Sequence, residues 1–126
     1  MSTKTILTAL TILLGMSTLL NGEIDSKQAV RAMVGEASNQ GYRGLLAVGC
    51  VIRHRGSIQG LYGAKAAHCD REPAWVWNLA RKAWKDSETT DPTGGATHFE
   101  NLKLSHPYWA DSMTKTVKIG DHQFYK

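Results

Sequence analysis

The sequence lacks the short motifs that mark zinc enzymes and nucleophilic hydrolases. It has two cysteines in 126 residues, and no C-x-x-C, H-x-x-x-H or G-x-S-x-G occurs. His98, His106 and His122 are spaced by eight and sixteen residues, which matches no compact metal motif. These absences argue against a zinc hydrolase and against a serine or cysteine nucleophile, and we expect no metal or other cofactor.

Internal repeats, low-complexity segments and basic stripes with interleaved aromatic residues are also missing. The formal net charge is +4 at pH 7, and without a basic stripe we expect no nucleic-acid partner. A modest positive charge suits an anionic surface such as a bacterial wall, and it equally suits ordinary solubility.

Residues 1–22 carry one charge, Lys4, followed by an apolar run from Thr5 to Leu20. This pattern is typical of a secretory signal and is marginal for a membrane span. No A-x-A cleavage site is present, so a cleaved signal and an uncleaved anchor both stay open. We expect export to the periplasm, cell wall or exterior, and stable membrane insertion only if the segment stays uncleaved.

The remaining residues, 23–126, are enough for one small monomeric domain with a single core. Cys50 and Cys69 lie 19 residues apart. In an oxidising compartment they could pair, and a buried free thiol at Cys50 is an equal alternative. Because pairing depends on geometry, the sequence leaves this choice open.

A first helix is predicted to begin at Asp25, a favourable N-cap, and to end near Gly41. Val30, Met33, Val34 and Ala37 recur at helical spacing and form its apolar face. Glu36 falls about 60° beyond Met33, at the margin of that face. A carboxylate at such a margin is partly desolvated and still reaches a groove, which is the setting in which carboxyl pKa values rise.

Two more helices are predicted downstream. The apolar stretch 44–52 is assigned to a buried helix because cationic residues follow it. Residues 55–72 are predicted to form a loop with a short helix around 64–67, and Pro73 opens a third helix. Trp77 and Trp84 flank the apolar face of that helix and are interpreted as core or groove wall.

The last third changes to turn and strand patterns. Residues 91–101, DPTGGATHFEN, have turn chemistry, and residues 115–126, KTVKIGDHQFYK, predict a β-hairpin around Gly120 and Asp121. A helical first part followed by a small β element predicts an α+β fold.

Three stretches, VGEASNQGYRGLLAVGCVIRHR, DPTGGATHF and IGDHQFYK, together resemble the cell wall hydrolase family of spore cortex-lytic enzymes, the SleB/CwlJ type. The resemblance implies a lysozyme-like α+β fold for residues 23–126, with a mainly helical lobe and a small C-terminal sheet lobe flanking a glycan groove. It also implies cleavage of the β-1,4 bond between N-acetylmuramic acid and N-acetylglucosamine in peptidoglycan, by a lytic transglycosylase whose single catalytic acid is Glu36.

The chain departs from the family pattern at several positions. Gly35 stands where Ala is usual, Asn39 and Gln40 where Gly and Glu are common, and His54 and Asp121 where Asn is usual. The middle segment is also short and lacks the usual Phe-Ser stretch. These departures leave the acid intact and bear on substrate preference.

Glycoside cleavage needs an acid for the leaving oxygen, and a hydrolase needs a second carboxylate. A lytic transglycosylase does without the second one, because the 6-hydroxyl of muramic acid attacks and the same Glu acts as base. Asp91 is expected to shape its turn or hold a substrate-binding loop. Asp121 is expected to be solvated.

The remaining site assignments concern substrate binding. Thr93, Thr97 and His122 are candidates for hydrogen bonds to the sugar acetamido groups, with a structural role for His122 as an equal alternative. Tyr125 completes the predicted substrate-binding set and is better suited to packing than to catalysis. The alternatives to a transglycosylase are a non-catalytic peptidoglycan-binding module and a zinc amidase using His98, His106 and His122.

Overall fold

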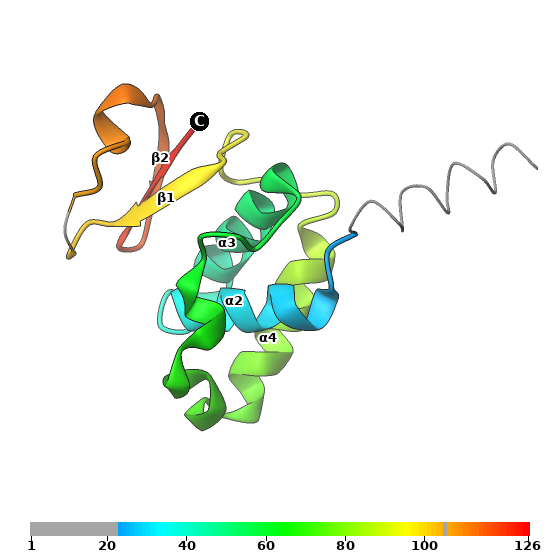
Figure 1. Cartoon of the computed structure of the whole chain (residues 1–126). Helices are drawn as coiled ribbons and strands as arrows, with labels where there is room; N and C mark the ends of the chain where they lie inside the picture. Colours follow the sequence, from blue (N-terminus) through cyan, green and yellow to red (C-terminus); the bar gives the residue numbers. More distant parts are fainter. Residues whose placement is uncertain (1–22, 105) are drawn as a thin grey trace, which may run out of the picture.

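The computed structural model describes residues 23–104 and 106–126, so the predicted signal or anchor, residues 1–22, lies outside the described residues. Three helices, α2 (Ser26–Ala37), α3 (Gly41–Arg55) and α4 (Ala74–Asp86), form a helical body, and a three-stranded sheet lies at one end of it (Figure 1). None of the helices in this part of the chain has the length and apolarity needed to cross a membrane.

The first predicted helix is confirmed as α2. The Asp25 side chain accepts a hydrogen bond from the backbone amide of Lys27 at 2.9 Å and caps the helix, as the sequence predicts. The expected apolar face is buried, and two further alanines, Ala29 and Ala32, are buried with it. The buried residues of α2 are Ala29, Val30, Ala32, Met33, Val34 and Ala37.

Helix α3 is the element that the helical body and the sheet share. Every residue from Gly44 to Ile52 is buried, which explains the uninterrupted apolar stretch in the sequence. Most of these side chains pack with α2 and α4, whereas Ala47 and Val51 pack against the sheet. The helix ends at Gly56 with a φ of 70°, where the backbone amide bonds to the carbonyl of Ile52.

The segment after α3 contains two short 3₁₀ helices, η1 (Tyr62–Lys65) and η2 (Ala67–Arg71), and packs on α2. The two backbones approach so closely that glycine is needed on both sides. A Cβ atom at Gly35 would lie 1.8 Å from the carbonyl oxygen of Gly63, and a Cβ atom at Gly63 would lie 2.8 Å from the amide nitrogen of Glu36. Gly35, which replaces the usual Ala, thus makes this approach available.

Polar side chains clamp the same segment onto α2. The Arg31 side chain donates to the Ala64 carbonyl at 2.7 Å and forms a bidentate ion pair with Asp70 at 2.8 and 3.2 Å. His68 lies 3.0 Å from the carbonyl oxygen of Gly35 through its Nε2 atom. These contacts fix the position of Gly63 against the last turns of α2.

Both cysteines are free and buried. The Cys50 thiol contacts the Thr90 carbonyl at 3.1 Å, and Cys69 contacts the Gly63 carbonyl at 3.4 Å. Burial raises the pKa of Cys50 to about 12, so this thiol stays protonated and is not a nucleophile. The choice that the sequence leaves open is resolved in favour of two packed thiols.

The sheet has the order β1-β3-β2, and all its pairings are antiparallel. Strands β2 (Lys115–Ile119) and β3 (His122–Tyr125) form the predicted hairpin, and β1 (His98–Asn101) is an additional strand that the sequence analysis assigned to a turn region. Phe99 pairs with Phe124 and faces the helices. The α+β prediction is therefore confirmed, with a larger sheet than the sequence indicates.

The opposite face of the sheet is covered by the chain's own connection between β1 and β2. Tyr125 lies edge-on against Trp109 at 5.4 Å, next to the short helix η3 (Ala110–Ser112). On the same face, the carboxylate of Glu100 lies 3.0 Å from the His106 ring, which also bonds to Asp111 at 2.9 Å. The two faces of the sheet therefore have separate roles, and only the inner face meets the helical body.

The contact between Gly35 and Gly63 predicts that neither position tolerates alanine. Gly35→Ala adds helix propensity of about 1 kcal/mol, but the clash with Gly63 costs about 1–3 kcal/mol as overpacking does elsewhere. We expect a net loss in the free energy of unfolding by urea denaturation for Gly35→Ala and for Gly63→Ala. Because both changes break one contact, the double variant should lose less than the sum of the two. Additive losses would contradict the shared contact.

Candidate active site

Glu36 lies in the last turn of α2 and is partly exposed. Its Oε1 atom accepts a hydrogen bond from the backbone amide of Gly63 at 2.9 Å. A Cβ atom at Gly63 would lie 2.7 Å from the Cγ atom of Glu36, so the backbone of η1 packs directly on this side chain. Among the described residues, no cationic side chain pairs with Glu36. One carboxylate oxygen is held by the Gly63 amide, and the other has no hydrogen-bond partner in the described part of the chain.

The tip of the hairpin docks just beyond the end of α2, four residues after Glu36. The backbone amide of Asp121 donates to Oε1 of Gln40 at 2.9 Å, and Nε2 of Gln40 donates to the Asp121 carboxylate at 2.9 Å. The hydrogen bond from Gln40, assisted by Lys103 at 3.4 Å, lowers the pKa of Asp121. Asp121 is therefore not the solvated turn residue that the sequence analysis expects.

Two glycines leave room for the Gln40 side chain. A Cβ atom at Gly120 would lie 2.2 Å from Oε1 of Gln40, and a Cβ atom at Gly44 would lie 2.4 Å from its Cβ atom. Gln40 and Asp121 are two of the positions that depart from the family pattern, in which Glu and Asn are common. The usual combination of Glu and Asn and the combination of Gln40 and Asp121 in this chain each contain one amide and one carboxyl group. The two departures therefore compensate each other across one contact.

His122 lies beside this tip on the inner face of the sheet. It is 1% exposed, and its ring packs against Phe99 at 4.9 Å and Phe124 at 6.2 Å between ring centres. Burial lowers the pKa of His122, which keeps the imidazole neutral near neutral pH. Its Nδ1 atom has no hydrogen-bond partner within residues 23–104 and 106–126.

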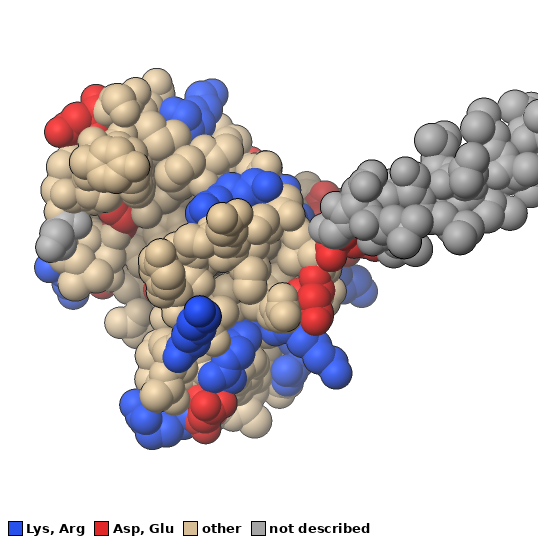
Figure 2. All heavy atoms as spheres, in the orientation of Figure 1, with Lys and Arg blue, Asp and Glu red and all other residues tan. Residues whose placement is uncertain are grey.

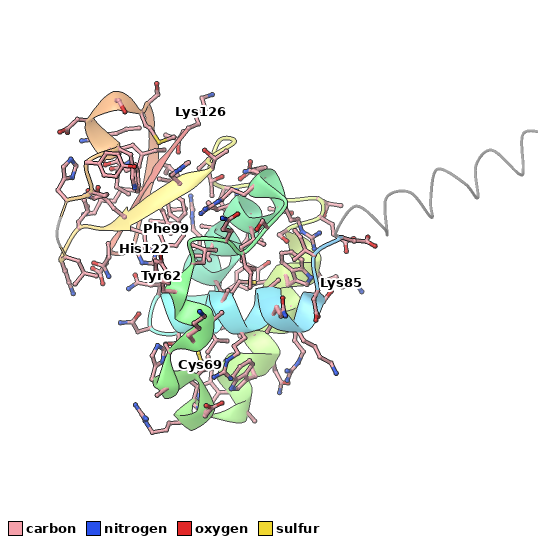
Figure 3. The ribbon with its side chains drawn as sticks, in the orientation of Figure 1. Tyr62, Cys69, Lys85, Phe99, His122 and Lys126 are labelled. Atoms are coloured by element: carbon pink, nitrogen blue, oxygen red, sulfur yellow. The ribbon has the colours of Figure 1, made fainter. Side chains whose placement is uncertain are left out.

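An exposed aromatic residue borders the same region. Tyr62 is 78% exposed and precedes Gly63, the residue that holds Glu36. Figure 3 shows Tyr62, Phe99 and His122 on one side of the molecule, where the sheet meets the helical body. Glu36, Gln40 and the hairpin tip belong to this junction through the hydrogen bonds that connect them.

The DPTGG loop is a turn built around Asp91. One carboxylate oxygen accepts hydrogen bonds from the amide and hydroxyl of Thr93 at 2.8 and 2.5 Å, and the other accepts from the amide of Gly95 at 3.0 Å. Burial alone raises the pKa of Asp91, but these hydrogen bonds outweigh it and the net pKa is lowered. Asp91 has the turn-shaping role that the sequence analysis expects of it.

His54 connects this loop to α3, a contact that the sequence does not predict: the sequence places His54 only among the cationic residues at the end of the helix and at a position where Asn is usual. Its Nδ1 atom lies 2.6 Å from the Ala96 carbonyl and its Nε2 atom 3.3 Å from the Asp91 carboxylate. Helix α4 and both short helices lie between His54 and Asp91 in the sequence, so no local pattern signals this contact. The loop therefore stays in a fixed position relative to α3.

Thr93 and Tyr125 do not fit a direct contact with substrate, because both are fully buried. The Thr93 hydroxyl bonds within its turn, and Tyr125 packs on the outer face of the sheet, opposite His122. These two assignments are corrected to shaping roles. Thr97 is half-buried, with its hydroxyl 2.9 Å from the His98 ring, and its predicted contact with substrate stays a prediction.

The three histidines of the zinc alternative point to different places. His122 faces the helices, His98 packs against Trp109 at 4.9 Å on the other face of the sheet, and His106 is occupied by Glu100 and Asp111. The described side chains therefore do not gather these histidines at one point, and this geometry gives the amidase alternative no support.

Comparison with known proteins gives one family and two similar structures. The sequence profile described as Cell Wall Hydrolase matches residues 62–125, just over half of the 126 residues. The catalytic domain of the germination-specific lytic transglycosylase SleB from Bacillus anthracis superposes with a TM-score of 0.62 at 28% identity, over 80% of this chain and 93% of that domain.

The catalytic domain of the Bacillus cereus SleB protein superposes with a TM-score of 0.59 at 24% identity, over 80% of this chain and 88% of that domain. This second likeness concerns the fold. A comparison with curated proteins finds no match. The profile match begins after Glu36, so the assignment of this residue depends on the geometry described above.

The compensating pair at the hairpin tip gives a prediction for exchanged charges. Gln40→Glu places two carboxylates against each other and removes the donor to Asp121, so stability and wall-clearing activity should both fall. Adding Asp121→Asn restores one amide facing one carboxylate, and the double variant should recover most of both, with a coupling of about 0.5–3 kcal/mol in urea unfolding. Asp121→Asn alone keeps a hydrogen bond and is the control. A double variant no more stable than Gln40→Glu would refute the pairing.

The buried imidazole of His122 predicts a stability loss in acid. Since the pKa of His122 is lower in the folded protein than the unfolded value of about 6.5, the unfolded chain binds more protons between these two values. The contribution of His122 to the free energy of unfolding is fully present above pH 6.5 and is lost as the pH falls through the folded pKa. His122→Gln should remove this slope, which is at most about 1.4 kcal/mol per pH unit.

The control for this measurement is His106→Gln. Hydrogen bonds that the His106 ring donates to the carboxylates of Asp111 and Glu100 raise the pKa of His106, so its contribution to stability is present below pH 6.5 and is lost as pH rises through the folded pKa. The two variants should change the pH dependence of unfolding in opposite directions. An unchanged acid slope in His122→Gln would show that this residue does not titrate on unfolding.

Proposed function

Because the chain belongs to the cell wall hydrolase family, enzymes that act on peptidoglycan, we propose that it is a lytic transglycosylase. It cleaves the β-1,4 bond between N-acetylmuramic acid and N-acetylglucosamine with Glu36 as its single acid and base. The activity named for the similar Bacillus anthracis domain supports this reaction. The observation that carries the assignment is the fixed Glu36 carboxylate at the junction of the helices and the sheet.

The reaction divides into two proton transfers at one carboxyl group. In the first, Glu36 gives its proton to the glycosidic oxygen, the bond from that oxygen to C1 of muramic acid breaks, and positive charge develops at C1. In the second, the 6-hydroxyl of the same sugar attacks C1 and Glu36 takes its proton. The products are a 1,6-anhydro end and a free 4-hydroxyl, and no water is consumed.

The hydrogen bond from Gly63 suits this double use of Glu36. It holds Oε1 in one orientation, so the second oxygen is the one that carries the proton to the substrate and back. Alignment of a reacting group reduces the entropy that must be lost in the transition state. The clamp of η1 and η2 on α2 thus contributes to catalysis by holding one side chain.

Four other carboxylates among the described residues already have partners. Glu72 pairs with His68 at 3.1 Å, Asp91 is held in its turn, and Asp121 is held by Gln40. Glu100 lies on the outer face of the sheet with His106. A free second carboxylate is what a hydrolase requires, and the engagement of these four supports attack by the substrate's own hydroxyl.

The proposed substrate also requires the enzyme to leave the cytoplasm. The pattern of residues 1–22 predicts that export, as a cleaved signal or as an anchor. The same proposal includes contributions of Asp91 and Thr97 to substrate binding: Asp91 acts through the loop that it shapes, and Thr97 through its half-buried hydroxyl. His122 is 1% exposed, so its contribution is the structural alternative, in which it shapes the inner face of the sheet beside the hairpin tip.

The test of the assignment is Glu36→Gln, which keeps the size of the side chain and removes the proton. Loss of general acid–base catalysis lowers rates about 10²–10⁴-fold, so clearing of purified peptidoglycan should almost stop. The melting temperature should stay close to that of the wild type, since the oxygen that accepts from Gly63 is kept. Glu88→Gln, at a 63% exposed side chain, is the control and should retain full activity.

Retention of clearing within a few-fold by folded Glu36→Gln protein would contradict the catalytic assignment. A protein that binds peptidoglycan and releases no fragments, with or without Glu36, would instead be a binding module.

A further inference from the structure

A pocket that the proposed reaction does not use lies between the start of α2 and the middle of α4. Its volume is about 200 Å³, below the range of about 300–1,000 Å³ typical of sites for drug-sized ligands. Such a pocket has room for one sugar residue and its substituent rather than for an oligosaccharide. The lining residues are Ser26, Lys27, Val30, Trp77, Arg81 and Trp84.

The indole ring of Trp84 in this pocket is held rigidly. Trp84 is 8% exposed, and its Nε1 atom donates to the Ser26 hydroxyl at 3.3 Å. The Arg53 guanidinium stacks on the ring at 3.7 Å and is itself bonded to the Ser87 hydroxyl at 2.6 Å. A platform fixed in this way loses little freedom when a ligand binds.

The pocket combines an apolar floor with a cationic rim. Trp77, Trp84 and Val30 supply apolar surface, whereas Lys27 and Arg81 supply positive charge and none of the six lining residues is acidic. Figure 2 shows that most of the Lys and Arg side chains visible on its face of the molecule lie over the helical body rather than over the sheet. Indole rings pack on the apolar faces of sugars, and cations pair with carboxylates.

The position of the pocket separates it from the active site. Val30 and Glu36 are six residues apart on α2, a rise of about 9 Å, and they point about 120° apart around the helix axis. A glycan strand in contact with Glu36 therefore does not continue straight into the pocket. The occupant is a different part of the wall.

We propose that this pocket is a second binding site for peptidoglycan. It takes an N-acetylated amino sugar on the indole of Trp77, with Trp84 as part of the pocket floor, and the neighbouring lactyl or peptide carboxylate pairs with Lys27 and Arg81. Bound there, the enzyme is held on one strand while Glu36 acts on another. The identity of the polymer rests on the proposed function, and the site itself rests on the pocket and its charges.

The experiment measures co-sedimentation of the full-length chain, in the Glu36→Gln background, with purified insoluble peptidoglycan. Trp77→Ala should weaken binding about two- to tenfold, the range expected for one aromatic contact. Trp75→Ala is the matched control, because Trp75 is on the same helix, is 65% exposed and lies outside the pocket. Arg81→Glu is a surface change that leaves the core intact, and it should weaken binding whether or not Trp77→Ala folds well.

In the active enzyme, the same variants should cleave a short soluble glycan at the wild-type rate and insoluble wall more slowly. Equal binding of Arg81→Glu, Trp77→Ala and Trp75→Ala to peptidoglycan would overturn the second site. It would also be overturned if Arg81→Glu and Trp77→Ala bound peptidoglycan normally and instead lost binding to anionic lipid vesicles. Failure of the wild type to cleave any glycan would contradict the proposed function instead, because the sedimentation assay still reports on the pocket.

Discussion

The proposed site depends on the contact between the backbones of Gly35 and Gly63. Because neither residue has a side chain, η1 settles onto α2 closely enough for the Gly63 amide to reach the Glu36 carboxylate. Arg31, His68 and Asp70 then hold the segment in place. A buried or half-buried carboxylate is costly unless it is hydrogen-bonded, and this one amide satisfies one of its oxygens while leaving the other open.

The second part of the site is positioned through α3 and the residue just before it. Ala47 and Val51 of α3 pack on the inner face of the sheet, and Gln40 bonds to the hairpin tip. The buried His122 therefore lies near the end of α2, although the two are far apart in the sequence. The helical body and the sheet pack together through α3. A change in the Gln40–Asp121 contact therefore also alters the position of the sheet relative to Glu36.

Much of this arrangement was predictable from local sequence patterns. The Asp25 cap, the apolar face of α2 and the hairpin at Gly120 follow from short-range periodicity and turn chemistry. Strand β1 was missed because its pairing with β3 joins segments more than twenty residues apart, and the DPTGG turn dominates its local signal. The Gly35–Gly63 approach and the His54–Asp91 contact were missed for the same reason.

The burial of Thr93 and Tyr125 was equally invisible, since burial depends on packing that no local pattern encodes. The central claim, that a single carboxylate directs attack by the substrate's own hydroxyl, is tested most directly by mass spectrometry of the fragments released from purified peptidoglycan. The account predicts glycan fragments with 1,6-anhydro-muramic acid ends, each lighter by one water than the hydrolysed form. Reducing ends, or free peptide stems with intact glycan strands, would contradict it.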